Sequence, residues 1–459
     1  MQQTIDRTFL CKLFYLLVSL MGSDILFPCV SQTAENPKMS ISQAVETALA
    51  NNPNLEAAQK RITGAEEKIA QADAGLMPQA YLSQRYSHTD NPMWALGTRL
   101  NQERITAADF DPGRLNNPDA IDNFATSVSV SWPVYDSGRT WYGRQQARLN
   151  HEAVNFMTNR VRQQVIGRTI MSYVGVLLSD ENLKVMEQTL ETARTHFSMV
   201  ESRFKGGFVV KSDLLRAQVH IADLEQQRLQ AQSQTDISRC MLNVAMGVDG
   251  NMRYELNSPL EKGKGPDESL DVWIAKALST RPDLIHLKLQ ENIADKEVNK
   301  ARSAHYPSVS LEGNYELNSE KGDDFGDNYN IGALVSLNLY SGGRISAGIR
   351  EARASQEEVN AMIRATEQQV CGETRQAFFN AQSAWERIKV AQAATGQAEE
   401  SLRIVQNRYN SGLFTITDLL DSETALHQAR TNHLRAVHDY RVAAVQLALA
   451  AGTLDENFQ

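Results

Sequence analysis

Several short stretches of the chain alternate strictly between apolar and polar residues. Residues 309–317 place Val, Leu, Gly, Tyr and Leu at every second position, with Ser, Glu, Asn and Glu between them. Residues 331–339 and 128–134 repeat this alternation, and residues 79–87 follow it less regularly. A period of two predicts β-strands with one apolar and one polar face. Strands of about ten residues with this pattern are typical of transmembrane β-barrels.

Two much longer stretches show helical spacing instead and are almost free of glycine and proline. They run from about Gly138 to Phe204 and from about Gly343 to Tyr409, and they are rich in Ala, Gln, Glu, Arg and Leu. Such stretches predict coiled-coil-like helices, each about 100 Å long at 1.5 Å per residue. Rods of this length do not fit a globular core, so we expect them to pack along one another as a bundle or tube.

The two halves of the chain are copies of one unit. Pro53 and Tyr86 recur as Pro282 and Tyr315 at an offset of 229 residues, and Tyr135 and Gly207 recur as Tyr340 and Gly412 at an offset of 205. The first copy therefore carries 24 extra residues (229 − 205), which fall between Tyr86 and Tyr135. Each copy is predicted as helix, strand, loop, strand, very long helix, glycine turn and helix. The first helices are expected over Ser40 to about Leu76 and Ser269 to Ala304, each ending before a proline.

This repeat divides the chain into predicted segments. Residues 1–31 read as a secretory signal peptide, with the apolar run Leu13 to Met21 behind two basic residues. The first repeat covers residues 39–258, a linker covers 259–267, the second repeat covers 268–454, and 455–459 form a tail. Cleavage after Ser31 is expected, and a lipid-modified Cys29 is the alternative. Behind the signal only Cys240 and Cys371 remain, which is too few for a disulfide framework.

The number of strands has a consequence for assembly. Four strands per chain do not close a membrane barrel, whose smallest form has about eight, and an open sheet edge is not tolerated in lipid. Several chains must therefore share one barrel. Two chains would give a filled barrel, whereas three would give about twelve strands and room for an aqueous channel. If the barrel serves as a conduit, three chains, and so a homotrimer, are favoured.

The order of these motifs resembles that of the TolC family of outer-membrane efflux proteins. The resemblance rests on the run Arg408 to Phe414, on Asp418-Leu419-Leu420-Asp421, and on the strand-to-helix joints at Tyr135 to Arg139 and Tyr340 to Arg344. The Asn52-Pro53 and Arg281-Pro282 turns support it. It covers residues from about Ser40 to Leu454 and implies a mainly α-helical trimer with a twelve-stranded transmembrane β-barrel and a helical tunnel across the periplasm.

The resemblance also implies partners and a tunnel tip. The Gly206-Gly207 and Gly412 turns would form the tip, where a periplasmic adaptor and an inner-membrane transporter of the RND, ABC or MFS type would dock. Such a duct would export drugs, metal ions or secreted proteins in a tripartite efflux pump or a type I secretion system.

Acidic residues just after this turn ring the entrance in the family, and Asp418 and Asp421 occupy the matching positions. In a trimer, their carboxylates would attract cations, disfavour anions and raise the pKa of some members through like-charge repulsion. The alternative is a structural role, in which Asp418 caps a helix starting at Leu419 and Asp421 supports the helix dipole.

Three further residues are candidates at the gate. Tyr409 and Asp213 occupy positions where the family links its two helical hairpins in the closed state. Phe414 departs from the basic gate residue that some members carry there. A ring of Phe414 side chains could close the pore by packing and dewetting, or Phe414 could be a core aromatic that anchors the turn.

Composition and motifs argue against other classes of function. The formal net charge of -9 comes from intermixed acidic and basic residues, so nucleic acid is not an expected partner. The chain has no Gly-rich phosphate loop, His-Glu-x-x-His or Gly-x-Ser-x-Gly motif, so neither catalysis nor a cofactor is expected.

Two weaker candidates for ion binding are also present. His427, His433 and His438 lack the spacing of three or four that aligns ligands on a helix, so we expect surface histidines. The acidic loop at residues 318–328 and the long loop at 88–123 are expected to be solvated rather than calcium-bound.

Two alternatives stay open at this level. A periplasmic adaptor also uses long helical hairpins, but it would need neither four lipid-compatible strands nor a duplication of the whole chain. A periplasmic enzyme on a helical scaffold would need a catalytic cluster, and the sequence shows none.

Overall fold

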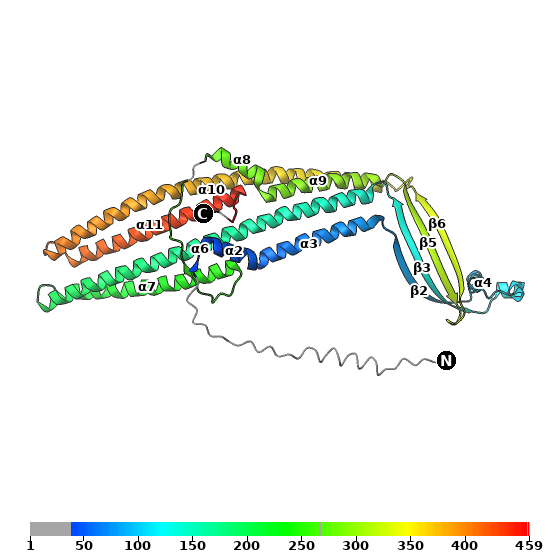
Figure 1. Cartoon of the computed structure of the whole chain (residues 1–459), viewed down its shortest axis with the longest axis horizontal. Coiled ribbons are helices and arrows are strands. Elements are labelled where there is room, and N and C mark those ends of the chain that lie inside the picture. The colour runs from blue at the N-terminus through cyan, green and yellow to red at the C-terminus, as the bar shows by residue number, and fades with distance from the viewer. Residues whose placement is uncertain (1–37, 266–267, 457, 459) are drawn as a thin grey trace, which may run out of the picture.

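The computed structural model describes residues 38–265, 268–456 and 458 of the 459-residue chain. The predicted signal peptide, with Cys29 and the expected cleavage site, lies outside the described residues. The molecule is elongated, with a bundle of long helices at one end and a four-stranded sheet at the other (Figure 1). Both predicted copies contribute two strands and four main helices to this arrangement.

Two helical hairpins form the end remote from the sheet. Helices α6 (Arg139–Lys205) and α10 (Arg344–Asn410) each have 67 residues, and their partners α7 (Lys211–Met246) and α11 (Ile416–Ala451) each have 36. Helix α6 packs against α7, α10 packs against α11, and α11 also packs along α6, which joins the two hairpins side by side. The predicted long helices are therefore confirmed, with ends within one residue of those expected.

Shorter helices line the half of α6 and α10 that is nearer the sheet. Helices α2 (Ile41–Asn51) and α3 (Pro53–Asp73) precede the first pair of strands, with a 3-10 turn η1 (Ala74–Leu76) after α3. Helices α8 (Leu270–Thr280) and α9 (Pro282–Ser303) hold the same place in the second repeat. Proline occupies the first helical position after each break, because its missing N–H costs nothing there.

The junction between α2 and α3 packs against Gly247, and the junction between α8 and α9 packs against Gly452. Helices α7 and α11 end at Gly247 and Gly452 in the left-handed conformation, with φ of 73° and 70°. A Cβ atom on Gly247 would lie 2.6 Å from the carbonyl oxygen of Asn51. The side-chain amide of Asn52 donates a 2.9 Å hydrogen bond to the Ala245 carbonyl. In the second repeat, the Thr280 hydroxyl donates to the Ala451 carbonyl at 2.7 Å.

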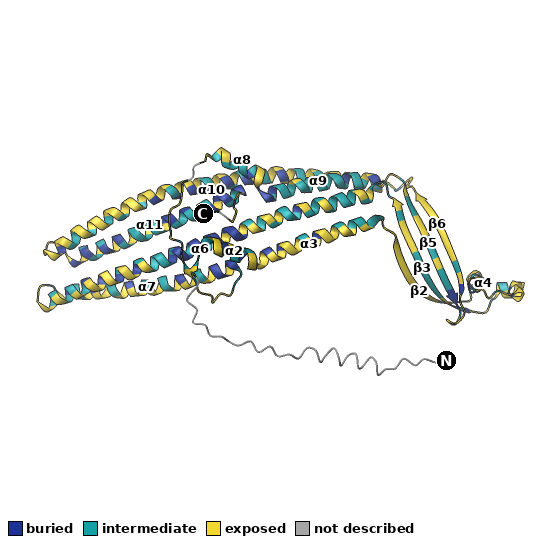
Figure 2. Ribbon diagram, in the orientation of Figure 1, coloured by how far each residue is buried: buried dark blue, intermediate teal, exposed yellow. Residues whose placement is uncertain are grey.

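The core lies at the middle of the helical bundle (Figure 2). Its largest fully buried side chains include Tyr173, Ile166 and Ile170 of α6 and Met246 of α7. The Tyr173 hydroxyl donates to the Met39 carbonyl at 2.8 Å, next to a small parallel pair of strands, β1 (Lys38–Met39) and β4 (Glu255–Leu256). Towards both ends of the molecule, half-buried and exposed residues predominate (Figure 2).

The sheet is antiparallel, in the order β2-β3-β5-β6. Its strands are β2 (Gln79–Thr89), β3 (Ile121–Tyr135), β5 (Ser308–Ser319) and β6 (Gly326–Ser336). The register aligns apolar residues in one row, Leu82–Val128–Tyr315–Tyr329, and polar residues in the next, Ser83–Ser127–Glu316–Asn328. Directly opposed residues share a face, so the predicted separation of apolar and polar faces is confirmed.

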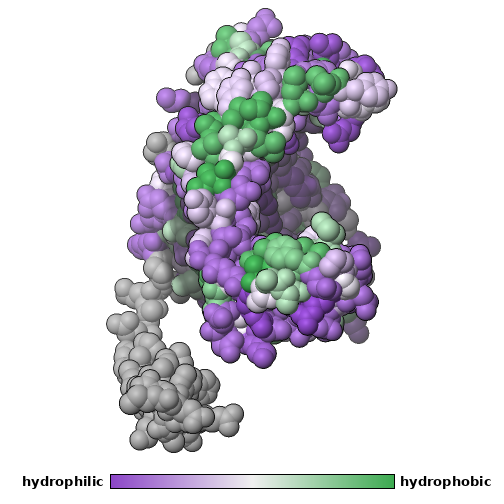
Figure 3. Space-filling model, turned by 90° about the vertical axis from the view of Figure 1, so that its right-hand side faces the viewer, coloured by the Kyte–Doolittle hydropathy of each residue, from purple (hydrophilic) through white to green (hydrophobic). Residues whose placement is uncertain are grey.

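The apolar face and two strand edges of this sheet are uncovered. Leu82 and Ile331 are 75% and 79% exposed. Within the described chain, β2 and β6 each pair with a single strand. Seen from the sheet end of the molecule, the surface shows hydrophobic patches between hydrophilic areas (Figure 3).

Two details differ from the sequence-based expectation. Strand β6 ends at Ser336 rather than Leu339, because Ser336 pairs with Ser308, the first residue of β5, and no strand residue lies opposite the next positions. The predicted long loop between β2 and β3 contains helical segments that were not among the predicted elements, namely α4 (Pro92–Asn101), a 3-10 turn η2 (Ala107–Phe110) and α5 (Pro112–Asn116). Asn91 and Asp111 cap α4 and α5 with their side chains.

Over the described residues, no helix combines the length and the apolar character needed to cross a lipid bilayer.

Candidate functional site

The two hairpin turns have the same backbone structure. In the first, the N–H of Phe208 donates to the Arg203 carbonyl and the N–H of Gly207 to the Phe204 carbonyl, both at 2.9 Å. In the second, Leu413 and Gly412 make the equivalent bonds, at 2.9 and 3.0 Å. This pattern is a Schellman motif, and its left-handed position is filled by Gly207 (φ 76°) and Gly412 (φ 75°). The two turns lie together at the end of the molecule farthest from the sheet (Figure 1).

An arginine joins these two ends. Arg203 in the last turn of α6 donates 3.2 Å hydrogen bonds to the carbonyl oxygens of Tyr409 and Asn410. Its guanidinium carbon also lies 4.8 Å from the centre of the Tyr409 ring, within range of a cation–π interaction. A second cross-link comes from Arg216, which donates to the Thr417 hydroxyl at 2.6 Å. Sequence reasoning missed both arginines, although basic residues at helix ends commonly bind the last carbonyl groups.

Tyr409 and Asp213, the predicted hairpin-linking residues, line one hollow of about 730 Å³ together with Arg203 and Phe414. Tyr409 is only 4% exposed and packs with Val200, Ile416 and Leu419. Burial raises the pKa of the Tyr409 hydroxyl, and the nearby Arg203 only partly offsets this effect. The side-chain hydrogen bond to the Tyr409 carbonyl comes from Arg203, and the roles of Tyr409 and Asp213 in linking the two hairpins stay predictions.

Phe414 lies half-buried against the apolar cluster formed by Val200, Tyr409, Ile416 and Leu419. The guanidinium carbon of Arg408 lies 5.5 Å from the centre of its ring. In a single chain Phe414 is therefore packed as an anchor of the turn. Its role in closing a pore stays a prediction.

Asp418 takes part in capping, although not in the way expected. Helix α11 begins at Ile416 rather than Leu419, because Thr415 is its N-cap and Asp418 is the third helical residue. The Asp418 carboxylate accepts hydrogen bonds from the Thr415 N–H at 2.8 Å and from its hydroxyl at 2.6 Å, which completes a capping box. These bonds lower the pKa of Asp418. Asp421 is exposed and lines a second hollow, beside Leu215 and His220 of α7.

The histidines of α11 differ from the expectation of surface residues. His427, His433 and His438 are all half-buried, on a helix that packs against α10, α6, α8 and α7. Burial lowers the pKa of His427. In the described part of the chain, no group of three or more His, Cys, Asp or Glu side chains is arranged to hold a metal ion.

Sequence reasoning also missed a buried polar cluster further along the hairpins, formed by Glu423, His196 and His220. A signal for it was present. Glu423 follows Leu419 by four residues and precedes Leu426 by three, so an acidic residue occupies the apolar stripe of α11.

Comparisons with known proteins agree with this architecture. Residues 44–248 and 273–453 match the model of the family described as "Outer membrane efflux protein", one segment in each repeat. The chain is 23% identical over 421 residues to the alkaline protease secretion protein AprF of Pseudomonas aeruginosa, covering 89% of this chain and 83% of that protein. It is also 23% identical over 461 residues to the outer membrane protein TolC of Escherichia coli K12, covering 97% of this chain and 87% of TolC.

Solved structures show the same fold. The Campylobacter jejuni CmeC outer membrane channel superposes with a TM-score of 0.75 at 19% identity, covering 91% of this chain and 87% of that one. The open state of the Neisseria gonorrhoeae MtrE outer membrane channel gives 0.73 at 16% identity, with coverage of 91% and 90%. The family match over both repeats decides the assignment. The chain belongs to the outer membrane efflux protein family of TolC-like channels, and it is a passive export channel rather than an enzyme.

Proposed function

We propose that three copies of this chain assemble into one continuous duct, with a twelve-stranded β-barrel in the outer membrane. The uncovered sheet carries this proposal. Strands β2 and β6 each leave one edge without a partner in the described chain, and an unpaired edge is costly in lipid. Pairing β6 of one copy with β2 of the next closes the ring and removes every edge. The face bearing Leu82 and Ile331 then meets lipid, and the face bearing Ser83 and Glu316 lines the lumen.

The helical half continues the same ring as a periplasmic tube. Hairpins α6/α7 and α10/α11 already lie side by side within one chain, and three chains supply six hairpins around one axis. The exposed apolar residues of α7, among them Leu215 and Val219, support burial of this helix against a neighbour. The turns at Gly207 and Gly412 form the inner end of the tube, where a periplasmic adaptor and an inner-membrane transporter dock.

At this inner end, Asp418 and Asp421 place six carboxylates around the entrance and favour cations over anions. Asp418 combines this charge with its capping role, because its carboxylate is already ionised and held by Thr415. Tyr409, Asp213 and Phe414, with Arg203, hold the two turns together in the closed state. Export begins when the adaptor and transporter separate these contacts.

Bilayer recording of the purified protein tests this function. A trimer, shown by its mass in detergent, should give small cation-selective currents. The periplasmic adaptor alternative receives no support from the comparisons, and it predicts a protein that is absent from outer-membrane fractions and does not conduct. A monomer without currents would overturn the duct.

A further inference from the structure

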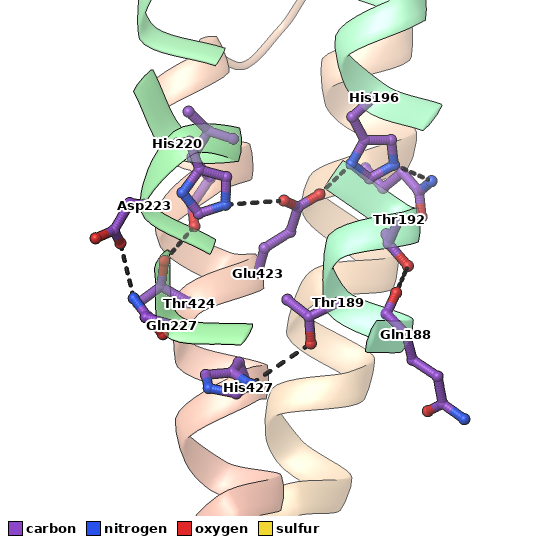
Figure 4. Close-up of polar contacts among 12 residues, drawn as sticks. Gln188, Thr189, Thr192, His196, His220, Asp223, Gln227, Glu423, Thr424 and His427 are labelled. Carbon is purple, nitrogen blue, oxygen red and sulfur yellow. Dashed lines mark hydrogen bonds and ion pairs between the residues drawn. The ribbon is translucent and has the colours of Figure 1, made fainter. Parts of the chain in front are cut away.

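A buried carboxylate lies between two histidines where the hairpins meet (Figure 4). Glu423 of α11 is 4% exposed, and one of its oxygens, Oε1, is in close contact with Nδ1 of His196 on α6, which is also 4% exposed. Its other oxygen, Oε2, faces Nε2 of His220 on α7 across 3.6 Å. Neither Oε2 of Glu423 nor Nε2 of His220 has a hydrogen-bond partner among the described residues. Helices α6, α7 and α11, which come from both hairpins, therefore meet at the Glu423 carboxylate.

Leaving a carboxylate in this place is unfavourable unless its neighbours compensate for lost hydration. Burial on its own would raise the pKa of Glu423, but the hydrogen bond from His196 and the nearby imidazole of His220 outweigh burial, so the pKa is lowered. Glu423 therefore stays ionised at pH values below the ordinary range of a glutamate. Its charge is present over the whole pH range in which histidine side chains take up protons, about pH 5 to 8.

The other groups around Glu423 leave the histidines as its partners. From α10, Gln406 places its amide nitrogen 3.1 Å from Nε2 of His196. From α7, Asp223 accepts a 2.7 Å hydrogen bond from Gln227 and shares a hollow of about 720 Å³ with His220, Arg216 and Asp421. This hollow gives His220 access to water and protons.

On α11 itself, His427 lies one turn from Glu423, with its Nδ1 3.5 Å from the Thr189 hydroxyl of α6 (Figure 4). It therefore faces α6 rather than the carboxylate. Asp421 and Thr424 occupy the exposed side of the same turn.

The cluster is present once per chain although the hairpins are repeated. At the offset of 205 residues, His196, His220 and Glu423 correspond to Ser401, Ala425 and Gln218. The repeat therefore does not require these residues for packing, since its other copy has none of them. A function specific to the contact between α11 and the α6/α7 hairpin explains the difference better.

We propose that Glu423, His196 and His220 form a proton-operated latch that tightens the contact between the two hairpins when the surroundings acidify. Protonation of either imidazole places a positive charge beside the ionised Glu423 carboxylate, so that a contact with one charged partner becomes an ion pair between two charged partners. The ionised carboxylate then draws α6 and α7 towards α11 and resists separation of the turns. This latch rests on the proposed function, because its effect on transport requires a channel whose entrance opens by hairpin separation.

The test is conductance of wild-type trimers in planar bilayers between about pH 8 and pH 5.5, compared with Glu423→Gln and His196→Gln. We expect the wild-type current to fall about threefold or more on acidification, and both variants to conduct more than wild type at about pH 5.5 with little pH response. His151→Asn is the matched control. His151 of α6 lies 3.6 Å from Glu66 of α3, a histidine–glutamate contact away from the entrance, so this variant should respond like wild type.

A spin-label distance between α6 and α11 gives a readout independent of current. Labels at the exposed positions Thr195 and Gln428, with Cys240 and Cys371 replaced by serine, should approach one another at lower pH in the wild type but not in Glu423→Gln. The latch is overturned if neither the current nor the distance of wild type changes with pH. It is also overturned if both variants respond to pH as strongly as wild type. Currents absent at every pH while the distance still shortens would overturn the channel and support the latch.

Discussion

The Arg203 guanidinium group binds Tyr409 twice, through a 3.2 Å hydrogen bond to its carbonyl oxygen and by lying 4.8 Å from the centre of its ring. Because Arg203 ends α6 and Tyr409 ends α10, this one contact joins the two longest helices of the chain where both turn back. Its main acceptor belongs to the backbone, so the contact depends more on the arginine than on the identity of its partner.

Arg203→Ala should therefore loosen the entrance and raise single-channel conductance several-fold, since hydrogen bonds to a charged group contribute about 1.5–3 kcal/mol. Tyr409→Phe should change conductance much less, because it keeps both the carbonyl and the ring. Lys205→Ala is the control, since Lys205 pairs with Glu201 of its own helix at 3.1 Å. Conductance of Arg203→Ala equal to that of wild type would show that the link does not restrain the entrance.

Replacing Asp418 and Asp421 together by asparagine should lower cation selectivity and weaken block by divalent cations. Thr415→Ala separates charge from capping, because it removes the hydroxyl that binds Asp418 but keeps both carboxylates. We expect it to destabilise the start of α11 while selectivity is retained. Reversal potentials in a salt gradient provide the measurement, and unchanged selectivity in the double variant would leave these aspartates with a structural role alone.

The Arg281 side chain, 4% exposed, bridges Asp283 at 2.6 Å and Glu373 at 2.5 Å. Burial alone would raise the pKa of both carboxyl groups, but hydrogen bonds from Arg281 outweigh it and lower them. Groups with a lowered pKa stabilise the fold above their ordinary pKa and lose this contribution as the pH falls. Arg281→Met should cost about 2 kcal/mol near neutral pH, less than a fully buried pair because Glu373 is partly exposed.

The difference between wild type and Arg281→Met should shrink as the pH falls below the ordinary range of carboxyl groups, where both become protonated. Thermal unfolding of the helices, followed by circular dichroism at several pH values, measures it. Lys276→Met, which removes an exposed pair with Glu268, should have little effect at any pH. A pH-independent difference would assign the role of Arg281 to packing.

Two glycines with the same backbone conformation should respond differently to alanine. A Cβ atom at Gly412 meets nothing within 4 Å. Gly412→Ala should therefore lower the free energy of unfolding only by the cost of a left-handed backbone, about 1–2 kcal/mol. At Gly247 the same atom would lie 2.6 Å from the Asn51 carbonyl oxygen, so Gly247→Ala must also displace the break between α2 and α3. Denaturation of both variants should show the greater loss at Gly247, and equal losses would contradict the close fit.

The features that sequence predicts best here depend on local structure. Helices α6 and α10 begin after Gly138 and Gly343, which adopt φ of 85° and 83°, and they end at glycine turns. These glycines lie within a few residues of the helix ends that they determine. The alternation of residues 309–317 likewise fixes which side chains of β5 share a face, whatever its neighbours are.

What sequence could not supply depends on which elements meet. The end of β6 is set by Ser308 of the neighbouring strand. His196 and Glu423 are 227 residues apart, and their contact requires that α11 pack along α6 with these two faces together. Arg203 reaches Tyr409 by the same packing. The predicted roles of Asp213, Asp418, Asp421 and Phe414 in a pore depend on an assembly of several chains, so they stay predictions.

The equal lengths of the repeated helices set the reach of the molecule. Because α6 and α10 have 67 residues each, and α7 and α11 have 36 each, both turns stop at the same level. In a trimer all six turns would lie in one plane, so the length of these helices would set how far the helical tube extends from the sheet. Seven residues correspond to about 10 Å of helix. Shortening the tube would require equal deletions in all four helices. A deletion in one hairpin alone would move alternate turns out of the shared plane.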